Sequence, residues 1–483
     1  MNSNLTIKDI HNKLVQKEIS CVDLVKYYLK RIKDYNKKLN VFLAVCEEDA
    51  LRQAKEIDEK ISKGKNIGIL EGIVFSVKDT IMTKGLKTTA GSEMLFNFIP
   101  CFDATSVKKL RNAGAILIGK TNCDSFGHGS SGENSDYGST KNPWNTSCVP
   151  GGSSSGAAVS VAMDMASFAL GEDTGGSIRC PASFCGVNGL KVSYGRVSRY
   201  GVIAYASSFD TVGPMAKHID DLAIILSIIS GKDEKDATTV FEKVPDYEKE
   251  ILGSIKSKKI GIPKEYFSSA LDSKVKEILD NAIKKFIELG CKIEKINLPY
   301  TEYAVPAYYI LTSSETSSNL SRLDGLRYGL SVKSETLQEK YQNSRAKGFN
   351  TETKRRIAMG TYSLSAGYYD AYYKKAQKVR TLIKEDFKKA FKKVDYILTP
   401  TMPFPAFKIG KKLKDPLSMY LSDIFTVPFS LAGIPSISIP GGFANKMPVG
   451  IQLSAPYLKE NEILKLAYCF EKATNFHKYR PKI

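Results

Sequence analysis

Apolar residues recur along the chain with two different periods, and each period predicts one kind of element. Leu24, Tyr27, Tyr28 and Ile32 are spaced by one to four residues in a way that puts them on one helix face. Short unbroken apolar runs between turn residues are typical of buried strands instead. Both patterns alternate along the chain.

The predicted strands cover residues 72–78, 115–119, 258–262, 291–296, 395–399, 436–440 and 449–453. The predicted helices cover residues 49–63, 105–113, 272–289, most of 335–393 and 460–474, while 303–323 should combine helix with site residues. Two earlier helices should begin after Thr6 and Ser20, each followed three residues later by an aspartate, as in a capping box. This alternation favours an α/β fold with a mixed sheet.

No internal repeat, long linker or low-complexity tract interrupts the 483 residues, of which 42% are hydrophobic. A chain of this length can bury a large core. We therefore expect one domain over residues 1–483, with the helices of about residues 1–65 wrapped around the core.

One stretch, residues 150–179, stands apart from these patterns and reads PGGSSSGAAVSVAMDMASFALGEDTGGSIR. Two glycine- and serine-rich loops, at residues 151–156 and 173–177, flank an apolar run at 157–170. Glycine allows backbone N–H groups to point at a ligand, and hydroxyl groups in such loops are candidate nucleophiles. The stretch is therefore the first candidate for a catalytic site.

A serine nucleophile needs a base, and the four histidines are weak candidates. His11, His218 and His477 lie in charged, helix-like contexts and are expected at the surface, whereas His128 lies in a glycine–serine loop and stays open as a candidate. Lys78 is the better candidate because it ends an apolar strand, where burial could favour its neutral form.

Strand alternation separates Lys78 from its acidic neighbour. Ser76 and Lys78 should share one side of the strand, and Asp79 should point to the other. A competing motif, G-x-S-x-G, would make Ser154 the nucleophile. That motif requires a preceding strand and a later histidine, but residues 145–150 are polar and end in proline.

Lys78, Ser153 and Ser177, in the frames GGSS and DTGGSIR, resemble the Ser–cisSer–Lys triad of the amidase signature family. The resemblance covers nearly the whole chain from about Leu5 and includes GEDTGGSIRCPASFCGVNGLK and YGRVSRYGVIAYASSFDTVGP. It implies a mixed central β-sheet covered by helices on both faces. It also implies that Ser177 is the nucleophile, that Ser153 follows a cis peptide bond and relays protons, and that Lys78 is the base.

The resemblance further implies that the backbone N–H groups of Thr174, Gly175 and Gly176 form the oxyanion hole. Preset donors of this kind stabilise the charge that develops when an amide carbonyl is attacked. The chain departs from the usual family frame at Ser155, where glycine is common, and at Ala157, where serine is common. These departures concern the loop rather than the triad.

Within the family, the chain most closely resembles the A subunits of glutamyl-tRNA(Gln) amidotransferases, in runs such as SSETSSNLSRLDGLRYG and KRRIAMGTYSLSAGYYDAYYKKAQKVR. This resemblance implies that Arg356 binds the α-carboxylate of glutamine, Asp423 its α-amino group, and that Tyr308 lines the pocket. Arg355 is an alternative to Arg356. A cation and an anion at fixed spacing select a zwitterion over neutral amides.

Ser130 and Ser131 lie in a loop that resembles another wall of the glutamine pocket. Family members often carry an apolar residue at the position of His128, which leaves the polarity of this wall open. Neither serine is singled out by spacing or periodicity.

The implied reaction is hydrolysis of glutamine to glutamate, with the ammonia used to convert glutamyl-tRNA(Gln) to glutaminyl-tRNA(Gln). The implied partners are the B and C subunits of the complex, with glutamyl-tRNA(Gln) reached through it. No cofactor is expected in this chain; it lacks a Walker A sequence, so ATP and Mg²⁺ are expected in the partner subunit. Whether aspartyl-tRNA(Asn) is also served stays open.

Two other functions remain alternatives. A free-standing amidase for fatty-acid, aryl or small aliphatic amides would share the triad but not the Arg356/Asp423 pair. A catalytically silent scaffold in an RNA-binding complex would not need Lys78, Ser153 and Ser177 together.

Composition adds limits rather than a function. The net charge of +19 is dispersed, without an RNA-binding motif, which favours a solvated lysine-rich surface. The nine cysteines are odd in number and lack a Cys-x-x-Cys pair, so no metal site is expected, and Cys180 draws interest only because it follows Ser177 closely. Without a run of eighteen apolar residues or a signal peptide, we expect no membrane association and a cytoplasmic location, or an organelle matrix of bacterial origin.

Overall fold

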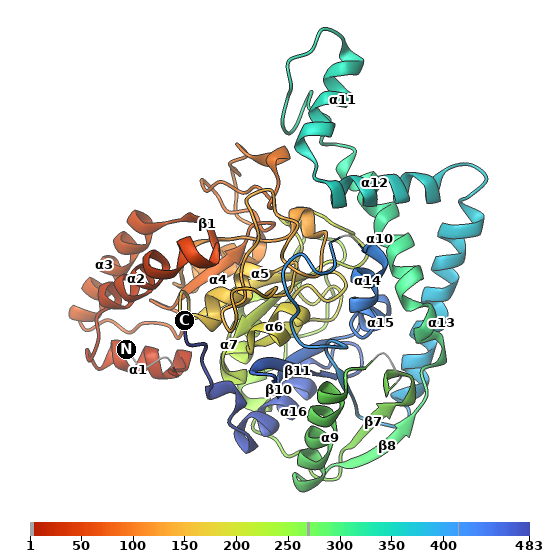
Figure 1. Cartoon of the computed structure of the whole chain (residues 1–483). Helices are drawn as coiled ribbons and strands as arrows, with labels where there is room; N and C mark the ends of the chain where they lie inside the picture. The colour runs from red at the N-terminus through yellow and green to blue at the C-terminus, as the bar shows by residue number, and fades with distance from the viewer. Residues whose placement is uncertain (1–3, 268–270, 414) are drawn as a thin grey trace.

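The computed structural model describes residues 4–267, 271–413 and 415–483 and is shown in Figure 1. The strands are β1 (Phe42–Val45), β2 (Val74–Lys78), β3 (Ile116–Thr121), β4 (Phe168–Asp173), β5 (Asn188–Lys191), β6 (Thr211–Ala216), β7 (Lys259–Pro263), β8 (Lys292–Ile296), β9 (Tyr396–Pro400), β10 (Ser436–Ala444) and β11 (Met447–Ser454).

The α-helices are α1 (Ile7–Val15), α2 (Cys21–Leu39), α3 (Glu47–Ser62), α4 (Thr105–Asn112), α5 (Ser155–Ala162), α6 (Arg179–Cys185), α7 (Ile219–Ile229), α8 (Tyr247–Glu250), α9 (Ser273–Glu288), α10 (Ala304–Leu320), α11 (Leu337–Gly348), α12 (Thr351–Leu364), α13 (Lys375–Ala390), α14 (Pro416–Tyr420), α15 (Val427–Ala432) and α16 (Glu460–Ala473). Shorter turns are η1 (Glu93–Leu95), η2 (Ser125–Gly127), η3 (Lys264–Phe267), η4 (Pro299–Tyr303), η5 (Asp370–Lys374, a π-helix), η6 (Leu421–Asp423) and η7 (Phe476–Lys478).

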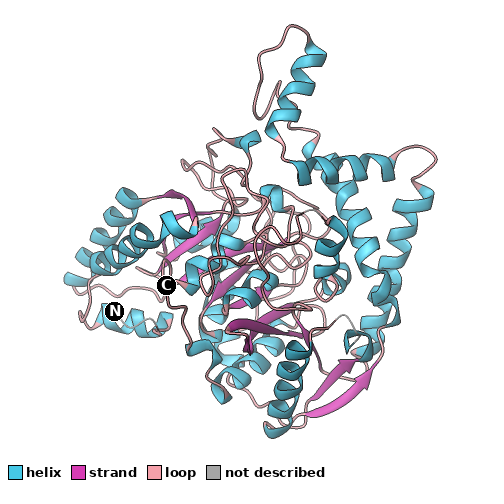
Figure 2. Ribbon diagram, in the orientation of Figure 1, coloured by secondary structure: helices cyan, strands magenta, loops and turns pink. Residues whose placement is uncertain are grey.

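The described strands form one mixed sheet in the order β1-β3-β2-β4-β6-β5-β10-β11-β9-β7-β8. β3, β2 and β4 run parallel to one another, as do β9, β7 and β8, and the strands between these two groups pair antiparallel. Figure 2 shows the strands crossing the middle of the molecule with helices around them. The predicted α/β class with a mixed sheet is confirmed.

Helices cover the sheet in two groups. α5 and α6 pack against each other and against the central strands, while α7, α9 and α16 form a second packed group that also contacts the sheet. Single glycines show the two faces of the sheet, because a Cβ at Gly450 of β11 would meet Ser183 of α6, whereas a Cβ at Gly441 of β10 would meet Ile278 of α9. α5 is buried along its whole length, consistent with a helix between other layers.

The remaining helices lie at the periphery. α1, α2 and α3 lie at one side of the molecule, and α10, α12 and α13 at the other, with α11 projecting outward (Figure 1). No described helix is both long and apolar enough to cross a bilayer.

The strands and helices predicted from apolar patterns are confirmed, with bounds shifted by at most about four residues. The N-terminal helix signals behave differently in detail. Thr6 and Asp9 form a complete capping box at α1, whereas at α2 the Ser20 side chain accepts from the Asp23 backbone without the reciprocal bond.

The apolar pattern does not predict β1, β4, β5 and β6. Each is short, and β4, β5 and β6 contain glycine or proline, which weaken a strand pattern. These strands are nevertheless central or paired, because neighbouring strands supply hydrogen bonds that local propensity does not reveal.

The expected surface position of His218 and His477 is wrong. Both imidazoles are buried, and their ring centroids lie 5.4 Å apart. His218 lies between β6 and α7, and His477 lies on η7, which packs against His218. The charged residues that flank both histidines in sequence therefore do not indicate an exposed position. His11 is partly buried in α1.

Candidate active site

The buried strand β2 delivers Lys78 to the serine loop. Lys78 is fully buried, and its Nζ donates to Ser153 Oγ at 2.8 Å. Ser76 shares this side, where its Oγ lies 2.9 Å from that of Ser160 in α5. Asp79 points elsewhere and accepts from the backbone N–H of Thr89. Strand alternation therefore separates Lys78 from Asp79 as the sequence predicted.

Lys78 also contacts a carboxylate that the sequence analysis did not consider. Glu172 Oε2 in β4 lies 3.3 Å from Lys78 Nζ and accepts from Thr80 Oγ1 at 2.7 Å. Glu172 is buried as well, so the two side chains meet inside the core. The lysine therefore has a hydroxyl partner and an anionic partner at once.

Ser153 lies directly before α5, and the peptide bond between Gly152 and Ser153 is cis. The neighbouring loop is held by Asp124, whose carboxylate accepts from the backbone N–H groups of Gly132 and Asn134. Burial raises the pKa of Asp124 to about 7. At Gly152, a Cβ would lie only 2.0 Å from Asp124 Oδ2, which explains why glycine precedes Ser153.

The loop that carries Ser177 is clamped by an ion pair between its two ends. Asp173, at the end of β4, pairs with Arg179 at the start of α6 at 2.9 Å, and both are fully buried. Burial alone would raise the pKa of Asp173, but the Arg179 guanidinium lowers it below its usual value. Arg179 also donates to the carbonyl of Thr426. The DTGGSIR frame thus encodes both the loop and its clamp.

The predicted oxyanion hole needs a correction at Gly176. Its backbone N–H donates to Asp173 Oδ1 at 2.9 Å, because the clamping carboxylate also caps the loop. No hydrogen bond of the N–H groups of Thr174, Gly175 or Ser177 is found in the described part of the chain. These groups are the donors that the structure leaves for a developing oxyanion.

Close packing explains the glycines of this loop. A Cβ at Gly175 would lie 2.3 Å from the hydroxyl of Tyr308, and one at Gly176 would lie 2.6 Å from Thr426 Oγ1. Thr174 anchors the loop from its other side, since its Oγ1 donates to Asp210 at 2.6 Å. The glycines therefore allow Tyr308 to approach the backbone beside Ser177.

Ser177 opens onto a small cavity, although only 8% of its surface is exposed. The cavity brings together residues from distant segments: Gly127, Gly129, Ser130, Gly175, Gly176, Ser177, Tyr205, Tyr308, Tyr309, Arg356 and Asp423. Lys78, Ser153 and Thr174 lie behind this lining rather than in it. Ser131 is buried, does not line the cavity, and is not brought to the site that was predicted for it.

Arg356 supplies the positive charge of the cavity. It lies on α12, where its Nε donates to Glu352 Oε1 at 2.6 Å and its Nη1 to the Tyr205 hydroxyl at 3.0 Å. Its guanidinium also stacks over the rings of Tyr309 and Tyr420. Arg355 is partly exposed and does not line the cavity, so the geometry favours Arg356 over its neighbour.

Asp423 supplies the negative charge. It lies on η6 and accepts from Ser130 Oγ at 2.8 Å and from the Tyr309 hydroxyl at 2.5 Å. Burial raises the pKa of Asp423 to about 6, against the opposing effect of these two hydrogen bonds. A carboxylate held in this way is suited to a ligand that brings a positive charge.

The competing candidates lie away from the cavity. His128 is buried between Thr353 and Thr316, and burial lowers the pKa of its imidazole well below the usual value. The Ser154 hydroxyl donates to the backbone carbonyl of Glu172, and no strand directly precedes α5. Burial raises the pKa of the Cys180 thiol, which donates to the Ser130 carbonyl. None of these groups reaches the position of Ser177 in the cavity.

Four functional candidates were missed by the sequence analysis: Glu172, Tyr205, Tyr309 and Glu352. Glu172 lies in the GED run beside the recognised frame, and Glu352 lies one helical turn before Arg356. An i,i+4 acid–base spacing could have signalled Glu352. The two tyrosines had no comparable signal, since aromatic residues are common in any core.

Comparisons with known proteins match the chain to amidases over nearly its whole length. A family model described as Amidase matches residues 23–464. The chain is 51% identical over 480 residues to a Carboxydothermus hydrogenoformans protein named as the A subunit of glutamyl-tRNA(Gln) amidotransferase, with 99% of each chain covered. A crystal structure of the protein of that name from Thermotoga maritima has a TM-score of 0.82 at 40% identity and covers 98% of this chain and 95% of that one.

A bacterial aryl acylamidase of the amidase signature family has a TM-score of 0.87, but only 22% sequence identity, with 98% of each chain covered. This likeness shows the fold alone. The overall fold is thus shared by proteins whose names give different amide substrates, and the substrate must be argued from the cavity.

Proposed function

The chain belongs to the amidase signature family, and from that premise we propose that it hydrolyses glutamine as the A subunit of a glutamyl-tRNA(Gln) amidotransferase. The observation that carries the proposal is that Arg356, Asp423 and Ser177 all line one cavity. Glutamine presents an α-carboxylate, an α-ammonium group and a side-chain amide. The cavity offers a fixed opposite charge for each ionic group and a nucleophile for the amide.

In the proposed reaction, Ser177 Oγ attacks the amide carbon while its proton passes to Ser153 and that of Ser153 passes to neutral Lys78. The C–N bond then breaks, and a proton returns along the same path to the leaving nitrogen, which departs as ammonia. Water attacks the resulting ester, glutamate leaves, and Ser177 regains its proton. Each step needs the hydroxyl of Ser153 between the other two groups.

Two surrounding groups support the charges that develop. The N–H groups beside Ser177 face the oxyanion, and Glu172 faces the ammonium group that Lys78 becomes when it accepts the proton. Glu172 therefore stabilises the product of the first proton transfer. The reaction must begin with Lys78 neutral, which remains a prediction.

The proposed assembly is a complex with B and C subunits, in which a partner activates glutamyl-tRNA(Gln) with ATP and Mg²⁺ and receives the ammonia. The names of the relatives support membership in such a complex. No Walker A sequence occurs in this chain, in keeping with ATP chemistry on a partner. The proposed location is the cytoplasm, where tRNA is charged.

The test is ammonia release from glutamine, asparagine and a simple neutral amide, measured with and without the partner proteins. A glutaminase prefers glutamine strongly and gives little turnover with the neutral amide. Efficient turnover of the neutral amide alone would favour a free-standing amidase instead. Failure to release ammonia from glutamine even with both partners would overturn the proposal.

A further inference from the structure

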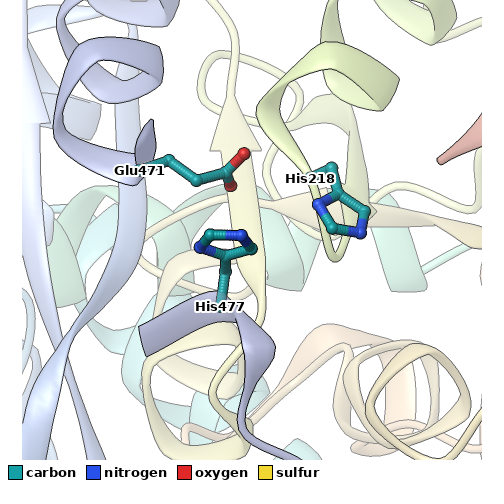
Figure 3. Close-up of side chains that lie close together, drawn as sticks. All are labelled: His218, Glu471 and His477. Carbon is teal, nitrogen blue, oxygen red and sulfur yellow. The ribbon is translucent and has the colours of Figure 1, made fainter. Parts of the chain in front are cut away.

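A second cluster of chemically reactive side chains lies outside the catalytic cavity, around His218, Glu471 and His477 (Figure 3). His218 follows β6 and precedes α7, Glu471 lies near the end of α16, and His477 lies on η7. One ring nitrogen from each histidine and one Glu471 carboxylate oxygen all lie within 4.8 Å of one another. The fold thus gathers two imidazoles and a carboxylate from three segments.

Two nitrogen atoms of this cluster have no hydrogen-bond partner among the described residues. They are His218 Nε2 and His477 Nδ1, on side chains that are only 5% and 8% exposed. Buried polar atoms are nearly always paired, so such orphans call for an explanation.

The carboxylate of Glu471 is already oriented by neighbouring donors. Asn188 Nδ2 donates to its Oε2 at 3.0 Å, and the backbone N–H of Ile219 donates to Oε1 and Oε2 at 3.3 Å and 3.2 Å. A carboxylate oxygen has lone pairs beyond those engaged here. Donors of this kind are typical outer-shell partners that fix a metal-binding carboxylate.

We propose that His218, Glu471 and His477 bind a zinc ion. Two imidazole nitrogens and one carboxylate oxygen are a donor set that zinc accepts, with water as the fourth ligand. Tetrahedral coordination at about 2.0–2.2 Å separates ligand atoms by roughly 3.4 Å, so the side chains need to approach by little more than about 1 Å. Magnesium, which prefers oxygen ligands in octahedral geometry, does not suit this set.

Two lysines next to the cluster residues in sequence face carboxylates. Lys217 contacts Asp164, and Lys472 lies 3.7 Å from Asp220. Arg480 donates to the backbone carbonyl groups of His477 and Tyr479. Glu471 is the carboxylate of the cluster that would meet a bound dication.

The ion would join the C-terminal segment to the start of α7, away from the catalytic loop. In the ladder between β4 and β6, Phe168 pairs with Ala216 at the histidine end, and Asp173 pairs with Thr211 at the catalytic end. The cluster and Ser177 thus lie beyond opposite ends of β4. The expected role is structural, and its test does not depend on glutaminase activity.

The test uses the full chain, freed of metal with a chelator and titrated with zinc chloride in competition with a chromogenic chelator. We expect one zinc per chain, an unfolding temperature raised by zinc but not by magnesium, and X-ray absorption showing nitrogen and oxygen ligands at about 2.0–2.2 Å. His218→Gln, Glu471→Gln and His477→Gln should each weaken binding at least tenfold, because even outer-shell losses cost about 10- to 100-fold.

His11→Gln is the matched control, since it removes an imidazole outside the cluster and should leave zinc binding unchanged. Circular dichroism identifies variants that fail to fold, and the absorption spectrum of wild-type protein tests the ligand set without any variant. Wild-type protein that binds less than about one tenth of an equivalent at micromolar zinc, sulfur ligands at about 2.3 Å, or full affinity in all three folded variants would overturn the proposal.

Discussion

The two sides of the catalytic cavity are built from different parts of the chain. The relay side consists of Lys78 at the end of β2, Ser153 in the turn before α5, and Ser177 in the loop between β4 and α6. The recognition side consists of Ser130, Tyr308, Arg356 and Asp423, which come from a loop, α10, α12 and η6. The relay therefore rests on the sheet, whereas recognition rests on peripheral helices and loops.

This difference separates the chemistry from the choice of substrate. The relay is fixed by short-range supports, such as the Asp173–Arg179 pair within one loop. The charges of the recognition side depend on contacts between segments far apart, such as Ser130 with Asp423. Binding residues on loops and peripheral helices can change while a rigid sheet is retained.

The sharpest way to separate the two sides is removal of the nucleophile. Ser177→Ala should lower ammonia release by about 10⁴-fold or more with glutamine and with any neutral amide, because the acyl-enzyme cannot form. Ser154→Ala is the matched control, since its hydroxyl bonds the backbone of Glu172 away from the cavity. Near-normal turnover by folded Ser177→Ala protein would contradict the relay assignment.

The next prediction concerns the base. Lys78→Arg should lower kcat for all amides by roughly 10²- to 10⁴-fold, because an arginine beside Glu172 keeps its charge and cannot accept a proton. Steady-state kinetics and circular dichroism measure the effect and the fold. Lys84→Arg, at an exposed position, is the control. Substantial activity of the Lys78→Arg enzyme would show that this side chain acts by charge alone.

The positions of Lys78 and Ser177 carry a local sequence signal, whereas their proposed roles come from the family resemblance. Ser177 and its clamp lie within seven residues, and Lys78 ends a strand whose apolar pattern is clear. The assignment of individual oxyanion donors was less accurate. Gly176 was expected to offer a free N–H group, but this group donates to Asp173, three residues earlier. A loop motif names the residues without showing which backbone donors are already used.

The recognition side and the histidine cluster could not be derived from local pattern. Arg356 and Asp423 are 67 positions apart in sequence numbering and meet only because α12 and η6 pack on α10 and its tyrosines. Family resemblance supplied these residues, and Ser131 shows its limit, since the adjacent Ser130 alone reaches the cavity. His218 and His477 were assigned to the surface because their neighbours are charged, although tertiary packing buries both.

The recognition side can be altered without leaving a buried charge unpaired. Arg356→Gln combined with Glu352→Gln removes both members of the pair and keeps the net charge. We expect kcat/KM for glutamine to fall roughly 30- to 5000-fold, because the α-carboxylate loses its partner. This range corresponds to a loss of about 2–5 kcal/mol of binding free energy in the transition state.

A simple neutral amide provides the comparison, since it has no α-carboxylate and should be affected far less. Arg355→Gln is the control, because this neighbour contacts the same glutamate but lies outside the cavity. A parallel loss with glutamine and the neutral amide would mean that Arg356 supports the fold of the site rather than recognition of the substrate.

The smallest expected effect is a pH dependence that belongs to the recognition side alone. Asp423 must be ionised to meet the α-ammonium group of glutamine, and burial raises its pKa to about 6. As the pH falls through about 6 the carboxylate gains a proton, so kcat/KM for glutamine, relative to that for a neutral amide, should fall about tenfold per pH unit below that value. Glutamine itself keeps both α-charges over this range.

Asp423→Asn and a neutral amide isolate this effect. A relay group that titrates affects both substrates, so the readout is the ratio of kcat/KM for glutamine to kcat/KM for the neutral amide. In wild-type enzyme this ratio should fall as the pH drops through about 6, because only glutamine has an ammonium group for Asp423. The asparagine variant should show a lower kcat/KM for glutamine near pH 7 and a ratio that does not change around pH 6. A wild-type ratio that stayed constant through pH 6 would mean that Asp423 does not meet the ammonium group, and the division of the cavity into two sides would fail at this residue.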